Sequence, residues 1–172
     1  MVRITSQPVP QGTLLCRHAD LPGVQSDAHV ATVPGQVALA EFVAAFLTSR
    51  AFAPEALILR LMLRRPTGAE AVTALARSQT HRYAAWQVET RTETELLMAV
   101  GTGPIRSWWS VRWLATGETQ LWFGSAILPV ATGARVPLLF RILNRFHLTY
   151  ARILLWGAVK TLRAPAAKTG AR

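Results

Sequence analysis

The sequence predicts an α+β domain in which a curved antiparallel sheet packs against one long C-terminal helix. Two observations carry this prediction. Between residues 81 and 130 the apolar residues alternate with a period of two, which is typical of strands. Between residues 137 and 163 they recur with the period of a helix instead. The chain has 172 residues, 51% of them hydrophobic, which is enough to bury one core and too apolar for disorder.

One strand and two short helices are expected before the alternating region. Residues 26–34, "SDAHVATVP", alternate in hydrophobicity and end at a proline, which predicts a first strand. Residues 38–49 and 51–65 have helical periodicity and predict two helices in succession. Residues 69–78 are also helix-like, but the segment is short and its structure stays open.

Four consecutive strands with short turns between them predict an antiparallel meander. The turn before the last strand is "TGE", in which Gly117 can adopt the positive φ that a tight hairpin needs. The four predicted strands are "HRYAAWQVET" (81–90), "TELLMAVG" (94–101), "IRSWWSVRWLA" (105–115) and "TQLWFGSAILPV" (119–130).

A long amphipathic helix is expected from Pro137 to about Arg163. At about 100° per residue, Tyr150, Ile153 and Leu154 fall on a broad apolar face that needs a partner, and the sheet is the obvious one. The opposite face carries four basic residues: Arg141, Arg145, Arg152 and Arg163.

The chain is interpreted as a single domain at residues 25–163. Residues 1–24 are rich in Pro, Gly and Gln without periodicity and are predicted to be an N-terminal loop segment. Residues 164–172 are predicted to be a disordered tail.

The charge distribution leaves two interpretations open. The formal net charge is +10, and no acidic residue follows Glu118. The basic face of the long helix, Arg141 to Arg163, is then either a solvated surface or a docking surface for anionic lipid or nucleic acid.

The composition also restricts which metal sites and which cellular compartment are expected. Cys16 is the only cysteine, which excludes an intramolecular disulfide and a cysteine-based zinc cluster, and the four histidines are scattered, so that no metal site and no cofactor are expected. We expect no signal peptide, because residues 1–12 lack an apolar core. Arginines interrupt the apolar region at 137–159, so no membrane span is expected, and the default prediction is a cytoplasmic protein.

The order of these elements resembles the helix-grip fold of the SRPBCC superfamily, which includes START domains and polyketide cyclases. A more specific resemblance is to a domain of unknown function in that superfamily. It implies a curved sheet that grips the C-terminal helix around a cavity, but it implies no particular reaction, because the superfamily contains both binders and enzymes. The stretches that carry it are "DAHVATVP" (27–34), "LILRLMLRR" (57–65), "WFGSAILPV" (122–130) and "LLFRILNRFHLTYARILL" (138–155).

The leading functional hypothesis is a binding protein for a small hydrophobic or amphipathic molecule, held between the sheet and the C-terminal helix. The expected lining residues are Trp109, Trp113, Phe123 and Tyr150, and the expected polar fixings are His147 and Arg60. An alternative is a cyclase- or hydrolase-type enzyme with His147 and Tyr150 as its acid–base pair, so that the sequence leaves catalysis open.

The stretch "RSWWSVRW" (106–113) bears on a third hypothesis, nucleic-acid binding. Alternation directs Trp109 and Trp113 toward the helix and leaves Trp108, with Arg106 and Arg112, on the other face of the strand. An aromatic ring beside two arginines could stack on bases, but no nucleic-acid-binding motif accompanies it, so we do not expect a nucleic-acid partner.

Overall fold

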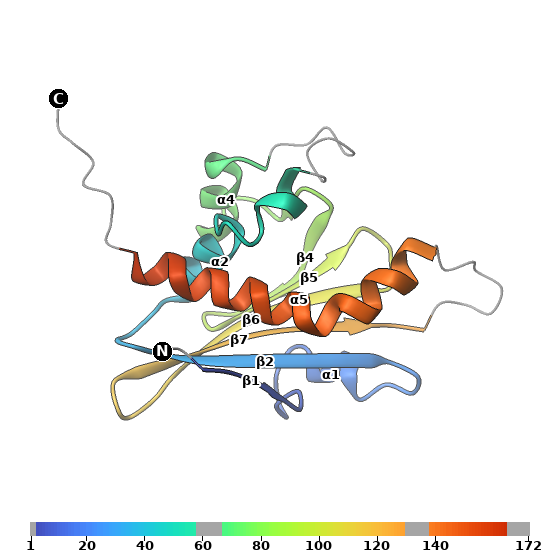
Figure 1. Cartoon of the computed structure of the whole chain (residues 1–172), viewed down its shortest axis with the longest axis horizontal. Coiled ribbons are helices and arrows are strands. Elements are labelled where there is room, and N and C mark those ends of the chain that lie inside the picture. Colours follow the sequence, from blue (N-terminus) through green and yellow to red (C-terminus); the bar gives the residue numbers. More distant parts are fainter. Residues whose placement is uncertain (1–2, 58–66, 130–137, 165–172) are drawn as a thin grey trace.

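The chain folds around one seven-stranded antiparallel sheet with a long C-terminal helix across one face, as the computed structural model of the protein shows (Figure 1). The structure describes residues 3–57, 67–129 and 138–164, with the side chains of the last helix described from Tyr150 onward. The predicted α+β class is confirmed. The strands are β1 (Ile4–Gln7), β2 (Gln25–Pro34), β3 (Arg82–Tyr83), β4 (Trp86–Arg91), β5 (Glu95–Val100), β6 (Ile105–Trp113) and β7 (Glu118–Ile127).

The strand order in space is β1-β2-β7-β6-β5-β4-β3. The predicted meander is confirmed as β4 to β7, and β3 adds a short edge strand. The predicted first strand is β2, which pairs with β7 along its whole length, from Gln25 opposite Ile127 to Pro34 opposite Glu118. The sheet therefore joins a strand from the beginning of the chain to the last strand of the meander.

The helices agree with the periodicity where they are described. The segment at 38–49 forms α2 (Leu39–Leu47), whose first turn is held by the Glu41 carboxylate accepting the Ala38 backbone N–H at 2.9 Å. The segment at 69–78 forms α4 (Ala69–Ala76), and the long predicted helix is α5 (Leu138–Arg163).

The second predicted helix, at 51–65, is described only in its first part. Residues 53–57 are helical, and residues 58–66 lie outside the described residues. The predicted tail at 164–172 also lies outside them, apart from residue 164.

The prediction of a loop over residues 1–24 is wrong in two places. Residues 4–7 form β1, which pairs with β2, and α1 (Cys16–Ala19) forms a short helix. Periodicity could not reveal either element, because β1 has only four residues and α1 one turn. Figure 1 shows α1 on the side of the sheet away from α5.

The main core lies on the side of the sheet that faces α2 and α5, here called the helix-facing side. Its centre is an aromatic cluster in which the Phe46 ring lies 4.5 Å from Phe123 and 5.5 Å from Trp109, measured between ring centroids. Trp109 and Phe123 come from neighbouring strands and lie directly opposite each other. The side chains of α2 thus fill the space above the middle of the sheet.

A second, smaller core lies on the far side of the sheet. Here Trp108 is fully buried against Leu14 and Leu15 of the N-terminal segment. The expectation that Trp108 faces outward beside two arginines is therefore wrong with respect to exposure. The strand alternation is as predicted, but the N-terminal segment covers this side of the sheet.

The packing of α5 differs from the predicted face at one position. Leu154 and Gly157 face the core as expected, and the closest packing is at Gly157, where an added Cβ atom would lie 2.6 Å from the Cβ atom of Ala51. Ile153, predicted to be buried, is 48% exposed, because the buried face of the helix is centred on Ala151 and Ala158, on nearly the opposite side. None of the described helices is long and apolar enough to cross a membrane.

Replacing Gly157 by alanine should lower the free energy of unfolding by about 1–3 kcal/mol, because the new methyl group collides with Ala51. In a helix without this contact the same change would stabilise by about 1 kcal/mol. Urea unfolding followed by circular dichroism measures the difference. The reverse exchange on an exposed helical residue, Ala69→Gly in α4, is the control and should cost at most about 1 kcal/mol. A Gly157→Ala variant as stable as the parent would contradict the close contact of α5 with residues 49–51.

Candidate functional site

Four buried polar side chains gather at one end of the helix-facing side of the sheet. We call them the polar cluster: Asp27 and His29 from β2, Ser125 from β7 and Ser107 from β6. Ser125 lies directly opposite both Asp27 and Ser107 in the sheet register, so that three of the four form a row across three strands. Directly opposed residues have Cβ atoms about 4.5–5.5 Å apart, which brings their polar atoms within reach of one another.

Strand alternation places the polar cluster on the same side as the main core. Asp27 and His29 are four and two residues before Ala31, which is buried in that core, and Ser125 follows Phe123 by two. All four side chains are buried or nearly so, with His29 at 0% and the Asp27 side chain at 12% exposure. They form a polar region on a surface that is otherwise apolar.

The contacts within the cluster are short. The Ser125 hydroxyl donates to Asp27 Oδ1 at 2.5 Å, and Asp27 Oδ2 lies 3.1 Å from His29 Nε2. On the neighbouring strand, the Ser107 hydroxyl accepts a hydrogen bond from the Trp86 indole at 3.2 Å. Such contacts hold the carboxylate, the imidazole and the hydroxyl groups in fixed positions.

The other ring nitrogen of the histidine continues the network to the edge strand. The Ser6 hydroxyl of β1 lies 3.0 Å from His29 Nδ1. The sequence of contacts, from the Ser6 hydroxyl to the His29 imidazole to the Asp27 carboxylate, is the one found in the catalytic triad of serine hydrolases. The contact between His29 Nε2 and Asp27 Oδ2 lacks the alignment of a hydrogen bond, which that chemistry requires, so we assign no catalytic role to this set.

The cluster lies where α5 begins. The strand β7 ends at Ile127, close to Ser125, and Figure 1 shows the first turns of α5 near the same end of the sheet. Figure 1 shows α5 running from this end over the sheet, with α2 beside its C-terminal half. The aromatic core and the polar cluster therefore lie under different parts of the same helix.

Two of the residues predicted to line a cavity are part of the aromatic core. Trp109 and Phe123 are 3% and 5% exposed, and their ring centroids are 5.5 Å apart. Phe46 packs against both, so these two rings belong to the centre of the main core, and a role for them in lining a cavity stays a prediction.

Trp113, which was expected to point toward the helix, lies at the rim of that side and is 42% exposed. Its indole N–H donates to the carbonyl oxygen of Val37, in the segment before α2, at 3.0 Å.

Tyr150 is the remaining predicted lining residue, and it is bound to an acidic partner. Its hydroxyl donates to Glu55 Oε2 at 2.8 Å. Burial, the Glu55 charge and this hydrogen bond together raise the pKa of Tyr150 well above its usual value. Near neutral pH the phenol can therefore donate a hydrogen bond, but it cannot act as a base.

The structure does not describe the side chains of the two predicted polar fixings, so their part in the site stays a prediction. His147 belongs to α5, but its side chain lies outside the described residues, and Arg60 lies outside them entirely. The acid–base pair of His147 with Tyr150 stays a prediction.

The polar cluster itself was not among the predicted site residues. A signal was available in β2, because Asp27 and His29 alternate onto the same side as Ala31 and Val33. The positions of Ser107 and Ser125 depend on the register of three strands, which no local pattern specifies.

A groove of about 310 Å³ lies on the far side of the sheet, between residues 10–13 and the strands β5 to β7. At its floor, Glu95 Oε2 accepts two hydrogen bonds, from the Trp108 indole at 2.7 Å and from the Leu14 backbone N–H at 2.9 Å. The carboxylate thus fixes the N-terminal segment to the sheet and satisfies the buried indole N–H of Trp108.

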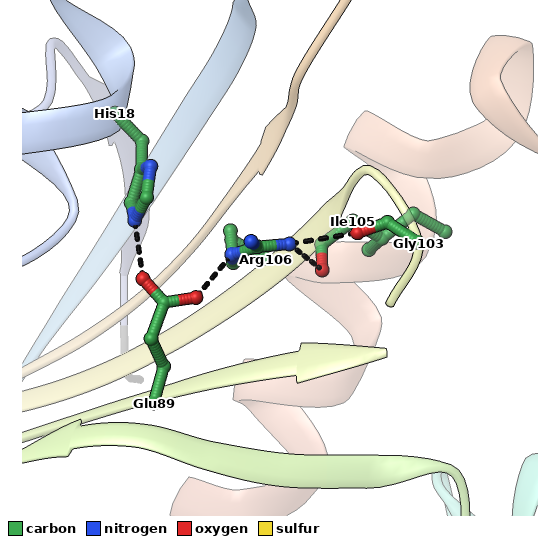
Figure 2. A network of polar contacts seen from close by, with 5 residues as sticks. All are labelled: His18, Glu89, Gly103, Ile105 and Arg106. Carbon is green, nitrogen blue, oxygen red and sulfur yellow. Dashed lines mark hydrogen bonds and ion pairs between the residues drawn. The ribbon is translucent and has the colours of Figure 1, made fainter. Parts of the chain in front are cut away.

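A second polar network on this side also has a structural role. Figure 2 shows Glu89 of β4 between His18 and Arg106: one carboxylate oxygen contacts His18 Nε2 of α1 at 2.7 Å, and the other forms an ion pair with Arg106 of β6. Arg106 also donates to the carbonyl oxygens of Gly103 and Ile105, at 2.8 and 3.3 Å. Since Arg106 is engaged in this way and Trp108 is buried, these two residues do not form an exposed stacking surface for nucleic-acid bases.

Comparison with known proteins yields no match: no family model, no curated protein and no solved structure matches the chain. In the described part of the chain, no three His, Cys, Asp or Glu side chains are close enough to hold a metal ion.

Both tyrosines of the chain should remain protonated in the folded protein when free tyrosine ionises. Burial and the Glu55 charge raise the pKa of Tyr83 to about 12, and the pKa of Tyr150 is raised as well. Absorbance at 295 nm should therefore show no ionisation below about pH 11, whereas the urea-unfolded chain should titrate near pH 10.

Because the folded protein raises the pKa values of both tyrosines, its stability falls as the pH rises through them. The tyrosines contribute their full stabilisation below about pH 10, and it is lost as pH rises toward about 12. Glu55→Gln removes the charge and should move both ionisations to lower pH. One tyrosine equivalent that ionises near pH 10 in the folded parent protein would contradict the described environment.

Proposed function

We propose that this chain is a ligand-binding domain of the helix-grip type, which holds a small amphipathic molecule between α5 and the helix-facing side of the sheet. The observation that carries the proposal is the polar cluster, a set of buried polar side chains on an otherwise apolar surface. Ligand sites are typically apolar surfaces with a few fixed polar groups of this kind.

Energetics support a role beyond packing. Burying a carboxylate, an imidazole and two hydroxyl groups is costly unless each finds a partner. Apolar residues of similar size would fill the same space without this cost. Polar groups that persist at such a position are expected where they recognise the polar end of another molecule.

The charge of the cluster selects the head group of that molecule. Asp27 is an acceptor when ionised, and the hydroxyl groups of Ser107 and Ser125 can accept as well as donate. A ligand with a donor head group, an amine or an alcohol, complements this set, whereas a carboxylate would be repelled by Asp27. The apolar tail would lie along the helix-facing side toward the aromatic core.

Binding of three matched ligands tests this proposal. Decylamine, decanol and decanoate have similar tails and different heads, and displacement of a fluorescent hydrophobic probe measures their affinities. We expect decylamine and decanol to bind more tightly than decanoate. Ser125→Ala removes the hydroxyl that holds Asp27 and should weaken decylamine binding about tenfold.

The matched control is Ser110→Ala, because Ser110 is a buried serine of β6 on the far side of the sheet. Its affinities should equal those of the parent protein. Asp27→Asn should reduce the preference for the amine over the alcohol. Equal loss of affinity in Ser125→Ala and Ser110→Ala, or tightest binding of decanoate, would refute the proposal.

A further inference from the structure

The outward face of α5 carries apolar and basic side chains together. Ile153 and Trp156 are 48% and 44% exposed and lie within one turn of each other, so that they form a small apolar patch. At about 100° per residue they share an arc of about 100° with three exposed cations. We call this set the α5 stripe: Arg152, Ile153, Trp156, Lys160 and Arg163.

The cations of the stripe have no acidic partner among the residues that the structure describes. Lys160 Nζ lies 4.1 Å from the centroid of the Trp156 ring, and Arg152 makes a long 3.5 Å contact with the Ile4 carbonyl oxygen. No ion pair joins Arg152, Lys160 or Arg163 to a described carboxylate. The sequence has no acidic residue after Glu118 that could supply one from the same region.

Two requirements restrict the partner that fits this surface. Ile153 and Trp156 gain free energy only if the partner removes them from water, and the cations gain only if the partner is anionic. The surface of an anionic bilayer meets both, because negatively charged head groups lie next to an apolar interior. Trp in particular favours this interfacial depth.

A second copy of the chain and a nucleic-acid backbone each fail one requirement. A second copy of the chain would place the same three cations opposite one another and be repelled. A nucleic-acid backbone would satisfy the cations but would leave Ile153 in water.

We propose that the α5 stripe docks the protein on the surface of an anionic lipid bilayer, with Trp156 and Ile153 inserted at head-group depth. This surface faces away from the sheet and therefore does not compete with the helix-facing side, where the ligand of the proposed function would bind. The docking proposal stands without that function.

Sedimentation with vesicles tests the docking. The full chain is mixed with vesicles of equimolar phosphatidylcholine and phosphatidylglycerol or of phosphatidylcholine alone, at low and high salt. We expect binding to the anionic vesicles only, weakened by salt. The double variant Lys160→Gln/Arg163→Gln should bind at least tenfold more weakly, since each cation contributes about fivefold.

The control removes the same charge from elsewhere. Arg17→Gln/Arg112→Gln lowers the net charge equally through two exposed arginines on α1 and β6, on the far side of the sheet, and should reduce binding much less. Equal loss in the two double variants would show attraction by net charge alone and overturn the proposal. Equal binding to both kinds of vesicle, or none to either, would also overturn it.

Insertion of the aromatic ring is measured separately. Lipids brominated near the head group quench the fluorescence of a tryptophan that reaches them. We expect quenching in the parent protein, and its loss in Trp156→Phe with vesicle binding retained. Unchanged quenching in Trp156→Phe would place another surface on the bilayer and contradict the proposal, as would dimerisation of the protein through α5 in solution.

Discussion

The pairing of β2 with β7 is the interaction on which the rest of the structure depends. It joins the second strand in the sequence to the last along ten residues of each, from Gln25 opposite Ile127 to Pro34 opposite Glu118. Without it, the meander of β3 to β7 and the hairpin of β1 with β2 would be two separate small sheets with unpaired edges. The long helix α5 contacts both strands of this pair.

Both sides of the sheet are organised by this pairing. On the far side, Gly124 of β7 leaves room for Leu15 and the Trp108 ring, since an added Cβ would lie 2.9 Å from a methyl group of Leu15 and 2.7 Å from the Asp27 carbonyl oxygen. The N-terminal segment can therefore lie close to the sheet and close the second core. On the helix-facing side, the same register places Asp27 opposite Ser125 and creates the polar cluster. The register of this one strand pair thus shapes both sides of the sheet. The N-terminal segment covers the far side, and α5 covers the helix-facing side.

Much of the fold could be predicted because its signals are local. The alternation at 81–130 and the amphipathic region at 137–163 each extend over many residues, so both elements were identified correctly. The parts that were missed depend on distant partners. The strand β1 is stabilised by pairing with β2, and the burial of Trp108 depends on Leu14 and Leu15, which are far away in sequence.

The polar cluster was even harder to predict from local sequence patterns than the fold. Asp27 and Ser125 are 98 residues apart, and only the register of β2 against β7 brings them together. Trp109 and Phe123 were correctly placed on the helix-facing side, but their role depends on Phe46, which fills the space between them. Period-two alternation tells which side of a sheet a residue takes, and packing across that side decides whether it borders a cavity or fills a core.

The most direct test of the account is where a ligand perturbs the protein. Amide chemical shifts of the isotopically labelled chain, recorded by NMR during a titration with an alkylamine, report this position residue by residue. The account predicts the largest changes at Asp27, Ser107 and Ser125 and in the first half of α5, with little change at Glu95 and Trp108. Changes concentrated at residues 10–13 and Glu95, on the far side of the sheet, would contradict it.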